Sequence, residues 1–147
     1  MKLHGLLNSD LLAVMARIGH GDMIVITDNG FPFPINMMTK TIDLSVTKNL
    51  PRFLDVVKPV IEEYEFESVI LAQEIKTKNA QINNELINII RKKKSNLKQT
   101  SVKYIPHREF KDLVLHGAER SEPVVCVVRT SEFTPFANII LIAGVPF

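Results

Sequence analysis

Met23-Ile24-Val25-Ile26 is a short apolar run with β-branched side chains, and Thr27-Asp28-Asn29-Gly30 follows it directly. An apolar run of this length, bounded by a turn sequence, predicts a buried strand. Pro32 and Pro34 keep the loop after the turn extended, because a residue before proline avoids helical backbone angles. The segment therefore predicts a buried strand that leads into a surface loop.

Helical and strand patterns alternate on both sides of this run. Apolar residues at helical spacing predict helices over residues 11–18, from about Pro51 to a break or kink at Pro59, and over residues 80–94. Asn8-Ser9-Asp10 supplies N-cap candidates for the first helix, and Gly19 marks its end. Further strands are predicted over residues 41–46, 68–72, 124–128 and 139–142. The alternation predicts an α/β fold: a single domain over residues 1–147 with a mostly buried sheet flanked by helices.

Composition argues against several kinds of partner. Lys and Arg number 18 against 16 Asp and Glu, for a net charge of +2, which favours neither a nucleic-acid surface nor an acidic tail. No apolar stretch approaches the roughly 20 residues that span a bilayer, and the N-terminus lacks the apolar core of a signal peptide. The single cysteine, Cys126, lies in an apolar run, which fits a reducing compartment. We expect a cytoplasmic protein without nucleic-acid or membrane partners.

Common catalytic and metal-binding motifs are missing from the sequence. The histidines lack the spacing of a metal site, so no metal is expected; they are His4, His20, His107 and His116. No phosphate-binding glycine loop follows the first strand. Arg91-Lys92-Lys93-Lys94 is interpreted as the solvated end of a helix, because cations there complement the helix dipole and no aromatic residues are interleaved.

One cluster could carry chemistry. Ile18-Gly19-His20-Gly21-Asp22 joins the end of a helix to the first strand, and Asp28 lies at the far end of that strand. Ligands of α/β sheets collect at the carboxyl ends of strands. The end of a helix favours the protonated imidazole, which would bias His20 towards donating a proton. By itself this pattern also fits a purely structural loop.

Several motifs together resemble the ribose pyranase and fucose mutarotase family, and most closely its ribose pyranase branch. They follow the family's order and span nearly the whole chain: Leu7-Asn8-Ser9-Asp10, Ile18-Gly19-His20-Gly21-Asp22, Asp28-x-Gly30-x-Pro32-x-Pro34, Ile42-Asp43-Leu44, Glu74-Ile75-Lys76, His107-x-x-Phe110-Lys111, Val128-Arg129-Thr130-x-Glu132, Pro135-Phe136-Ala137-Asn138-Ile139-Ile140-Leu141 and Ala143-Gly144-Val145-Pro146-Phe147.

The resemblance implies an isomerase that interconverts the pyranose and furanose forms of D-ribose and supplies ribokinase with the usable form. It implies His20 as the proton donor, and contacts to the monosaccharide from Asp28, His107 and the segment Phe136, Ala137 and Asn138. It also implies no cofactor and a homo-oligomer, typically a decamer of two pentameric rings with sites near subunit contacts. Histidine suits such proton transfers, because its ordinary pKa lies near neutrality.

Three residues bear on the choice of sugar. The family usually has tyrosine where this chain has Phe136, and glycine where it has Ser131, while Gly21 is typical of the fucose branch. Three alternatives to a ribose pyranase are therefore kept: a mutarotase of another sugar such as L-fucose, a non-catalytic sugar-binding accessory of a ribose transport system, and a purely structural ring-forming protein.

Overall fold

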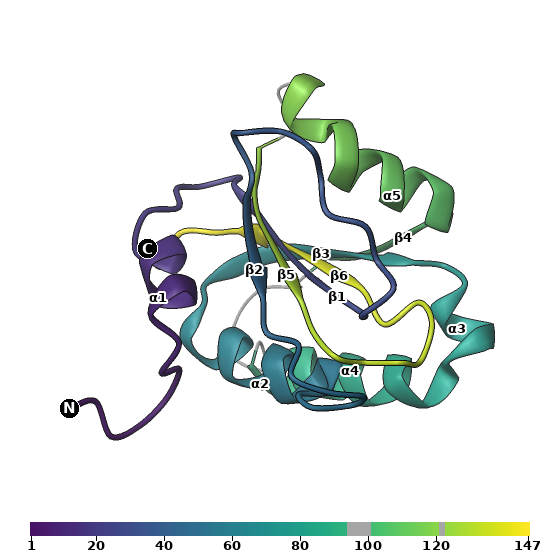
Figure 1. The fold of residues 1–147 in the computed structure, drawn as a ribbon, viewed down its shortest axis with the longest axis horizontal. Helices are drawn as coiled ribbons and strands as arrows, with labels where there is room; N and C mark the ends of the chain where they lie inside the picture. The colour runs from purple at the N-terminus through teal and green to yellow at the C-terminus, as the bar shows by residue number, and fades with distance from the viewer. Residues whose placement is uncertain (94–100, 121–122) are drawn as a thin grey trace.

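The computed structural model describes residues 1–93, 101–120 and 123–147. Six strands form one sheet in the order β2-β5-β1-β6-β3-β4 (Figure 1). They are β1 (Met23–Thr27), β2 (Lys40–Asp43), β3 (Phe66–Ala72), β4 (Ser101–Ile105), β5 (Val124–Arg129) and β6 (Ile139–Ala143). Strand β6 runs antiparallel to its neighbours β1 and β3, and every other pairing is parallel. Five strands therefore end, and β6 begins, at one edge, which we call the carboxyl edge; the opposite edge is the amino edge.

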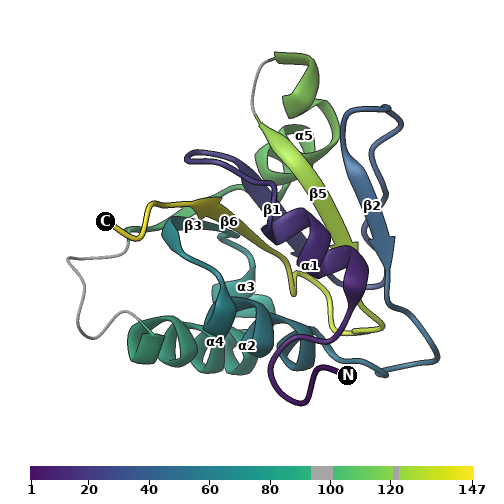
Figure 2. The same cartoon turned by 90° about the vertical axis from the view of Figure 1, so that its left-hand side faces the viewer.

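Helices cover both faces of the sheet. They are α1 (Ser9–Met15), α2 (Phe53–Glu63), α3 (Ile75–Lys78), α4 (Ala80–Lys93) and α5 (His107–His116), and a 3-10 turn, η1 (Gly117–Arg120), follows α5. Helices α2 and α4 lie side by side below the sheet in Figure 1, and α5 lies above it. Figure 2 shows α1 in front of β1 and β5. Among the described residues, no helix is both long and apolar enough to cross a membrane.

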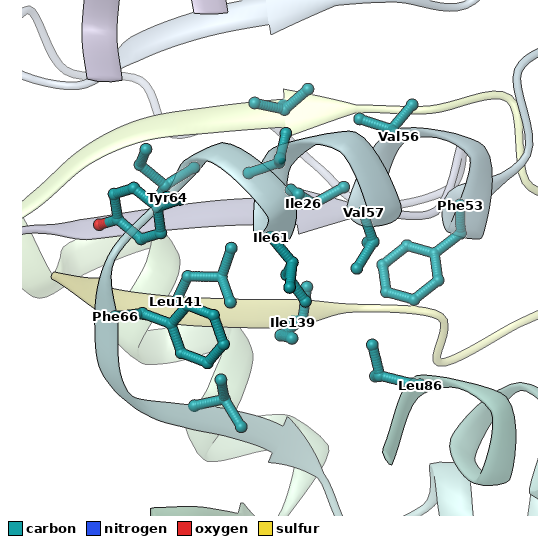
Figure 3. Packing of buried hydrophobic residues seen from close by; sticks show 14 of the residues in the cluster. Ile26, Phe53, Val56, Val57, Ile61, Tyr64, Phe66, Leu86, Ile139 and Leu141 are labelled. Carbon is teal, nitrogen blue, oxygen red and sulfur yellow. The ribbon is translucent and has the colours of Figure 1, made fainter. Parts of the chain in front are cut away.

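Side chains along β1 point alternately to the two faces of the sheet, so they belong to two separate parts of the hydrophobic core. Ile24 and Ile26 face the helices α1, α2 and α4, whereas Met23 and Val25 face α5. In the larger cluster, Phe53, Ile61 and Leu86 pack from α2 and α4 against Ile26, Ile139 and Leu141 of the sheet (Figure 3). All six side chains are fully buried. Burial of both faces explains why β1, β5 and β6 consist of almost continuous apolar residues.

The predicted α/β class with a buried sheet and flanking helices is confirmed, whereas two predicted helix ends need correction and two elements were missed. Helix α1 ends at Met15, before Gly19, and α2 continues through Pro59 to Glu63 because buried residues on both sides of the proline hold it against the sheet. Strand β4 and helix α5 were not predicted. Strand β4 is half exposed at the sheet edge and has no apolar run, and α5 buries only Phe110 and Val114. The end of the predicted helix at Lys94 lies outside the described residues.

Candidate functional site

Loops from three strands converge on a pocket of about 570 Å³ at the carboxyl edge. Asp28 directly follows β1, His107 comes two residues after β4, and Phe136 lies three residues before β6. The volume lies in the range of small-molecule sites. The lining combines aromatic and proline side chains with a few charged groups: Asp28, Asn29, Gly30, Phe31, Pro32, His107, Lys111, Glu132, Phe133, Thr134, Pro135 and Phe136.

Asp28 is a buried acid of the pocket, with 8% of its surface exposed. Its backbone N–H donates to Oδ1 of Asn138 at 3.0 Å, and Nδ2 of Asn138 donates to its Oδ2 at 3.0 Å. Burial raises the pKa of Asp28 above its ordinary value, because desolvation disfavours the charged form, and the hydrogen bond from Asn138 opposes that rise. A carboxyl group in this setting can both accept and exchange protons.

His107 begins α5, and two groups of contacts hold it. Its backbone N–H donates to both carboxylate oxygens of Glu74, at 3.0 and 2.9 Å. The imidazole lies edge-on to the ring of Phe136 at 5.0 Å and parallel to that of Phe110 at 6.4 Å. Burial lowers the pKa of His107 below its ordinary 6.5, with Glu74 opposing the shift. The ring is therefore set to be neutral at neutral pH.

Phe136 is the one member of the segment 136–138 whose side chain lines the pocket. Its φ angle of 65° lies in the left-handed region, which is uncommon for a bulky residue and costs on the order of 1–2 kcal/mol. Its carbonyl accepts the backbone N–H of Asn138 at 2.9 Å. Ala137 and Asn138 are fully buried. The strained backbone turns the aromatic ring towards His107 while the next two residues enter the core.

Glu132 and Lys111 also line the pocket, although the sequence indicated no role for either. Oε1 of Glu132 accepts the backbone N–H and the hydroxyl of Thr134, at 3.0 and 2.6 Å, and Oε2 accepts the N–H of Phe53 at 3.3 Å. Glu132 thus ties the pocket loop to the start of α2. Lys111 is four residues after His107 on α5, and this i, i+4 spacing is the local signal that could have indicated a shared face.

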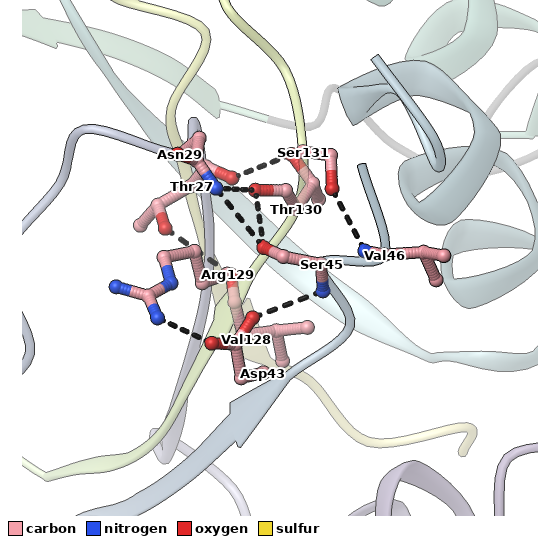
Figure 4. Close-up of polar contacts among 9 residues, drawn as sticks. All are labelled: Thr27, Asn29, Asp43, Ser45, Val46, Val128, Arg129, Thr130 and Ser131. Carbon is pink, nitrogen blue, oxygen red and sulfur yellow. Dashed lines mark hydrogen bonds and ion pairs between the residues drawn. The ribbon is translucent and has the colours of Figure 1, made fainter. Parts of the chain in front are cut away.

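A polar network joins the ends of β1, β5 and β2 beside the pocket (Figure 4). The Asn29 amide donates to Ser45 Oγ at 3.1 Å, and Ser45 Oγ donates to the carbonyl of Thr130 at 3.2 Å. Arg129 forms an ion pair with Asp43, and this contact lowers the pKa of Asp43 to about 2. The network fixes the strand ends from which the pocket loops leave.

His20 lies at the other side of the sheet, outside the pocket. It sits in the loop before β1, where the N–H of Gly21 donates to the carbonyl of Ala143 at the end of β6. Its exposed ring meets a carboxylate oxygen of Glu67 on β3, with 2.9 Å between Nε2 and Oε2. The length of β1, roughly 17 Å at 3.3 Å per residue, separates His20 from Asp28. The structure brings Asp28, His107 and Phe136 together, but it does not bring His20 to them within one chain.

The helix-dipole argument for His20 also changes with the structure. Helix α1 ends at Met15, five residues before His20, and the influence of a helix end fades within about one turn. The Glu67 carboxylate is the charged group that contacts the ring instead.

In the described parts of the chain, no group of three or more His, Cys, Asp or Glu side chains is placed to hold a metal ion.

Comparison with known proteins identifies the family. Residues 1–146 match the RbsD / FucU transport protein family. The chain belongs to this family. Family relatives named D-ribose pyranase include those of Bacillus cytotoxicus, 43% identical, and Bacillus mycoides, 41% identical, each aligned over the full length of both chains. The predicted resemblance is thereby confirmed.

Solved structures of the family share the fold. Bacillus subtilis RbsD complexed with D-ribose is 41% identical, covers all of both chains and superimposes with a TM-score of 0.83. The fucose mutarotase of Streptococcus pneumoniae in complex with L-fucose is 21% identical, with a TM-score of 0.73 over 95% of this chain and 94% of that one. At this lower identity the likeness concerns the fold alone.

Proposed function

We propose that this chain is a D-ribose pyranase, an isomerase that opens the ring of D-ribose and recloses it with a different ring size. The pocket at the carboxyl edge carries the proposal: it places a buried carboxyl, Asp28, and a half-buried imidazole, His107, beside an aromatic wall. Full-length identity of about 40% to proteins named D-ribose pyranase supports ribose as the sugar.

The chemistry requires only proton transfers. A cyclic aldose is a hemiacetal, and its ring opens when the ring oxygen gains a proton while the anomeric hydroxyl loses one. The free aldehyde then recloses through another hydroxyl group. The oxidation state of carbon does not change, so positioned acids and bases are sufficient, and each typically contributes about 10²–10⁴-fold to the rate. Asp28 and His107 are groups of this kind, and both line the same pocket.

His107 acts in this proposal as a neutral hydrogen-bond donor. Nδ1 is buried and without a hydrogen-bond partner among the described residues. A buried N–H group without an acceptor is rare in proteins, and an unpaired acceptor is tolerated better. We therefore assign the single proton of the neutral ring to Nε2, from where it can be donated to a sugar oxygen. Asp28 is the complementary acceptor for a sugar hydroxyl.

His20 reaches the sugar, in this proposal, from a second copy of the chain. Within one chain it lies at the amino edge, about the length of β1 away from the pocket, so one small sugar cannot contact both. A site shared between copies removes this separation, and Glu67 orients the His20 ring towards the neighbour. This arrangement requires a homo-oligomer, and a decamer of two pentameric rings is the assembly we propose.

We place the reaction in the cytoplasm, as a step of ribose breakdown that precedes phosphorylation. Cys126 is free and fully buried, and burial raises its pKa to about 12, which suits an inert thiol in a reducing compartment.

Proton NMR exchange spectroscopy on D-ribose tests the proposed activity. Wild-type protein is expected to accelerate pyranose–furanose exchange above the spontaneous rate. His20→Ala and His107→Ala should return the rate close to that baseline, whereas His4→Ala, a change at an exposed histidine that does not line the pocket, should leave the acceleration unchanged.

Two outcomes would point elsewhere. Acceleration with L-fucose and none with D-ribose would make the protein a mutarotase of the other sugar. Saturable ribose binding with exchange at the spontaneous rate would favour a non-catalytic sugar-binding protein.

A further inference from the structure

Asn138 makes a two-point contact with Asp28 across the carboxyl edge. Its Oδ1 accepts the backbone N–H of Asp28, and its Nδ2 donates to Oδ2 of the Asp28 carboxylate, both at 3.0 Å. The two residues are 110 positions apart in sequence and meet because β1 and β6 are antiparallel neighbours. A carboxamide supplies the one acceptor and the one donor that this pairing needs.

The same burial keeps the Asn138 side chain away from any ligand. Asn138 has none of its surface exposed and does not line the pocket, whereas Asp28 and Phe136 on either side of it do. The contact occupies Oδ2 of Asp28. The other oxygen, Oδ1, lies beside Gly30, 3.6 Å from the point where a Cβ on that glycine would stand.

We propose that Asn138 is a positioning residue that acts on the sugar only through Asp28, in place of the direct sugar contact expected from the sequence. Its carboxamide holds Oδ2, and the backbone N–H groups of Gly30 and Phe136 also bond to the carboxylate, so Asp28 keeps one orientation in which Oδ1 is the oxygen left for the sugar. It also stabilises the charged carboxylate through a donated hydrogen bond. This inference rests on the proposed function, because it takes Asp28 to be the group that contacts the sugar.

Titration of the ligand-free protein tests the contact without any assay of activity. The carbon NMR signal of the Asp28 carboxyl is followed with pH in wild type, Asn138→Ala and Asn138→Asp. Loss of the donated hydrogen bond should raise the pKa of Asp28 in Asn138→Ala, since that bond is the main influence lowering it. In Asn138→Asp a second carboxyl at 3.0 Å should raise the pKa further, because two carboxylates this close share one proton.

Asn79→Ala is the matched control. Asn79 is also buried, and its amide donates to the carbonyl of Pro135, which lines the pocket, at 3.3 Å, but it makes no contact with Asp28. It should leave the Asp28 titration unchanged. Superimposable titration curves for wild type and the two Asn138 variants would overturn the inference. The near-isosteric Asn138→Asp variant keeps the test available if Asn138→Ala fails to fold, which thermal melting will show.

A double-mutant cycle tests whether Asn138 acts through Asp28. Asn138→Ala should weaken ribose binding in the wild-type background and cause no further weakening in the Asp28→Ala background, with the Kd measured by calorimetry. Multiplying losses would mean that Asn138 contacts the sugar itself, which would overturn the inference. In addition, the rate of pyranose–furanose exchange with the Asn138→Asp variant should fall as pH rises and the two carboxyl groups lose their shared proton. Only the singly protonated pair keeps a hydrogen-bond donor where the amide of Asn138 had one. If the wild type proves inactive, the proposed function fails, while the NMR titration still shows whether Asn138 controls the pKa of Asp28.

Discussion

At the scale of single residues, the pocket shifts Asp28 and His107 towards their neutral forms. Burial raises the pKa of Asp28 and lowers that of His107, since desolvation penalises charge of either sign. The two groups also attract each other when charged, which opposes both shifts. At neutral pH each of these groups can act as a donor or an acceptor, which suits a reaction that adds one proton to the sugar and removes another.

Neighbouring charges should move the His107 titration in opposite directions. Glu74→Gln keeps an acceptor for the His107 backbone N–H but removes a negative charge, so the pKa of His107 should fall further. Lys111→Met removes a positive charge and should raise it. Nitrogen-correlated NMR of the imidazole measures both shifts and reports which nitrogen carries the proton. Glu109→Gln, an exposed change on the same helix, is the control; shifts of the same sign in the two test variants would contradict the prediction.

The sign of the effect on stability follows from the same shift. Because the pKa of His107 is lower in the folded protein, folding favours the neutral ring. This contribution to the free energy of unfolding is fully present above the ordinary pKa of 6.5 and is lost as pH falls through the folded value.

At the scale of elements, short strands and their loops place the site. The pocket residues come from the ends of β1 and β4 and from the loop between β5 and β6. The last of these loops is held by Glu132, which joins Thr134 to the first turn of α2. The aromatic wall around Phe136 therefore depends on a contact with a helix on the face opposite α5.

Glu132→Gln should loosen this loop. The amide has one acceptor oxygen, and its NH₂ group would face a backbone or hydroxyl donor, so at least one buried hydrogen bond is lost. We expect a loss of about 1–3 kcal/mol in the free energy of unfolding, together with a higher KM for ribose. Urea unfolding and exchange kinetics measure the two effects. Glu62→Gln, an exposed change on α2, should alter stability by less than about 0.5 kcal/mol; equal losses in both variants would contradict the anchoring role.

Prediction of strands from the sequence was most accurate where both faces of the strand are buried. The apolar runs of β1, β5 and β6 are buried on both faces, and local periodicity identified them. Strand β4 is only partly buried, and its stability comes from pairing with β3, a contact that local sequence does not encode. Helix α5 buries only Phe110 and Val114, so its apolar pattern was too weak to predict a helix.

At the scale of the whole molecule, the position of His20 is the main structural constraint on the proposed mechanism. His20 lies at the amino edge and the pocket at the carboxyl edge of the same sheet. The distance between the edges is a property of the fold, so a small movement of a loop cannot remove it. The proposed contact between copies, with one amino edge facing another carboxyl edge, would bring His20 to the pocket.

Mixed oligomers should reveal the shared site. His20→Ala and Asp28→Asn are each expected to be nearly inactive alone. After the two are refolded together in equal amounts, random assembly should make about one quarter of the sites intact, because one chain supplies His20 and the other supplies the pocket. Exchange spectroscopy should show this recovery, and light scattering should show a particle larger than a monomer. Refolding each variant by itself is the control; activity that stays at the level of the separate variants would contradict a shared site.

The sequence by itself determined the α/β class, the family and the identity of Asp28, His107 and Phe136 as site candidates. Buried apolar runs and ordered motifs are local features, so they can be recognised from the amino-acid sequence alone. Only the tertiary structure decided that β6 runs antiparallel, that Asn138, the residue just before β6, contacts Asp28, and that His20 lies at the opposite edge. These outcomes depend on which strands pair over long sequence separations, and pairing is selected by the burial of whole faces rather than by any single segment.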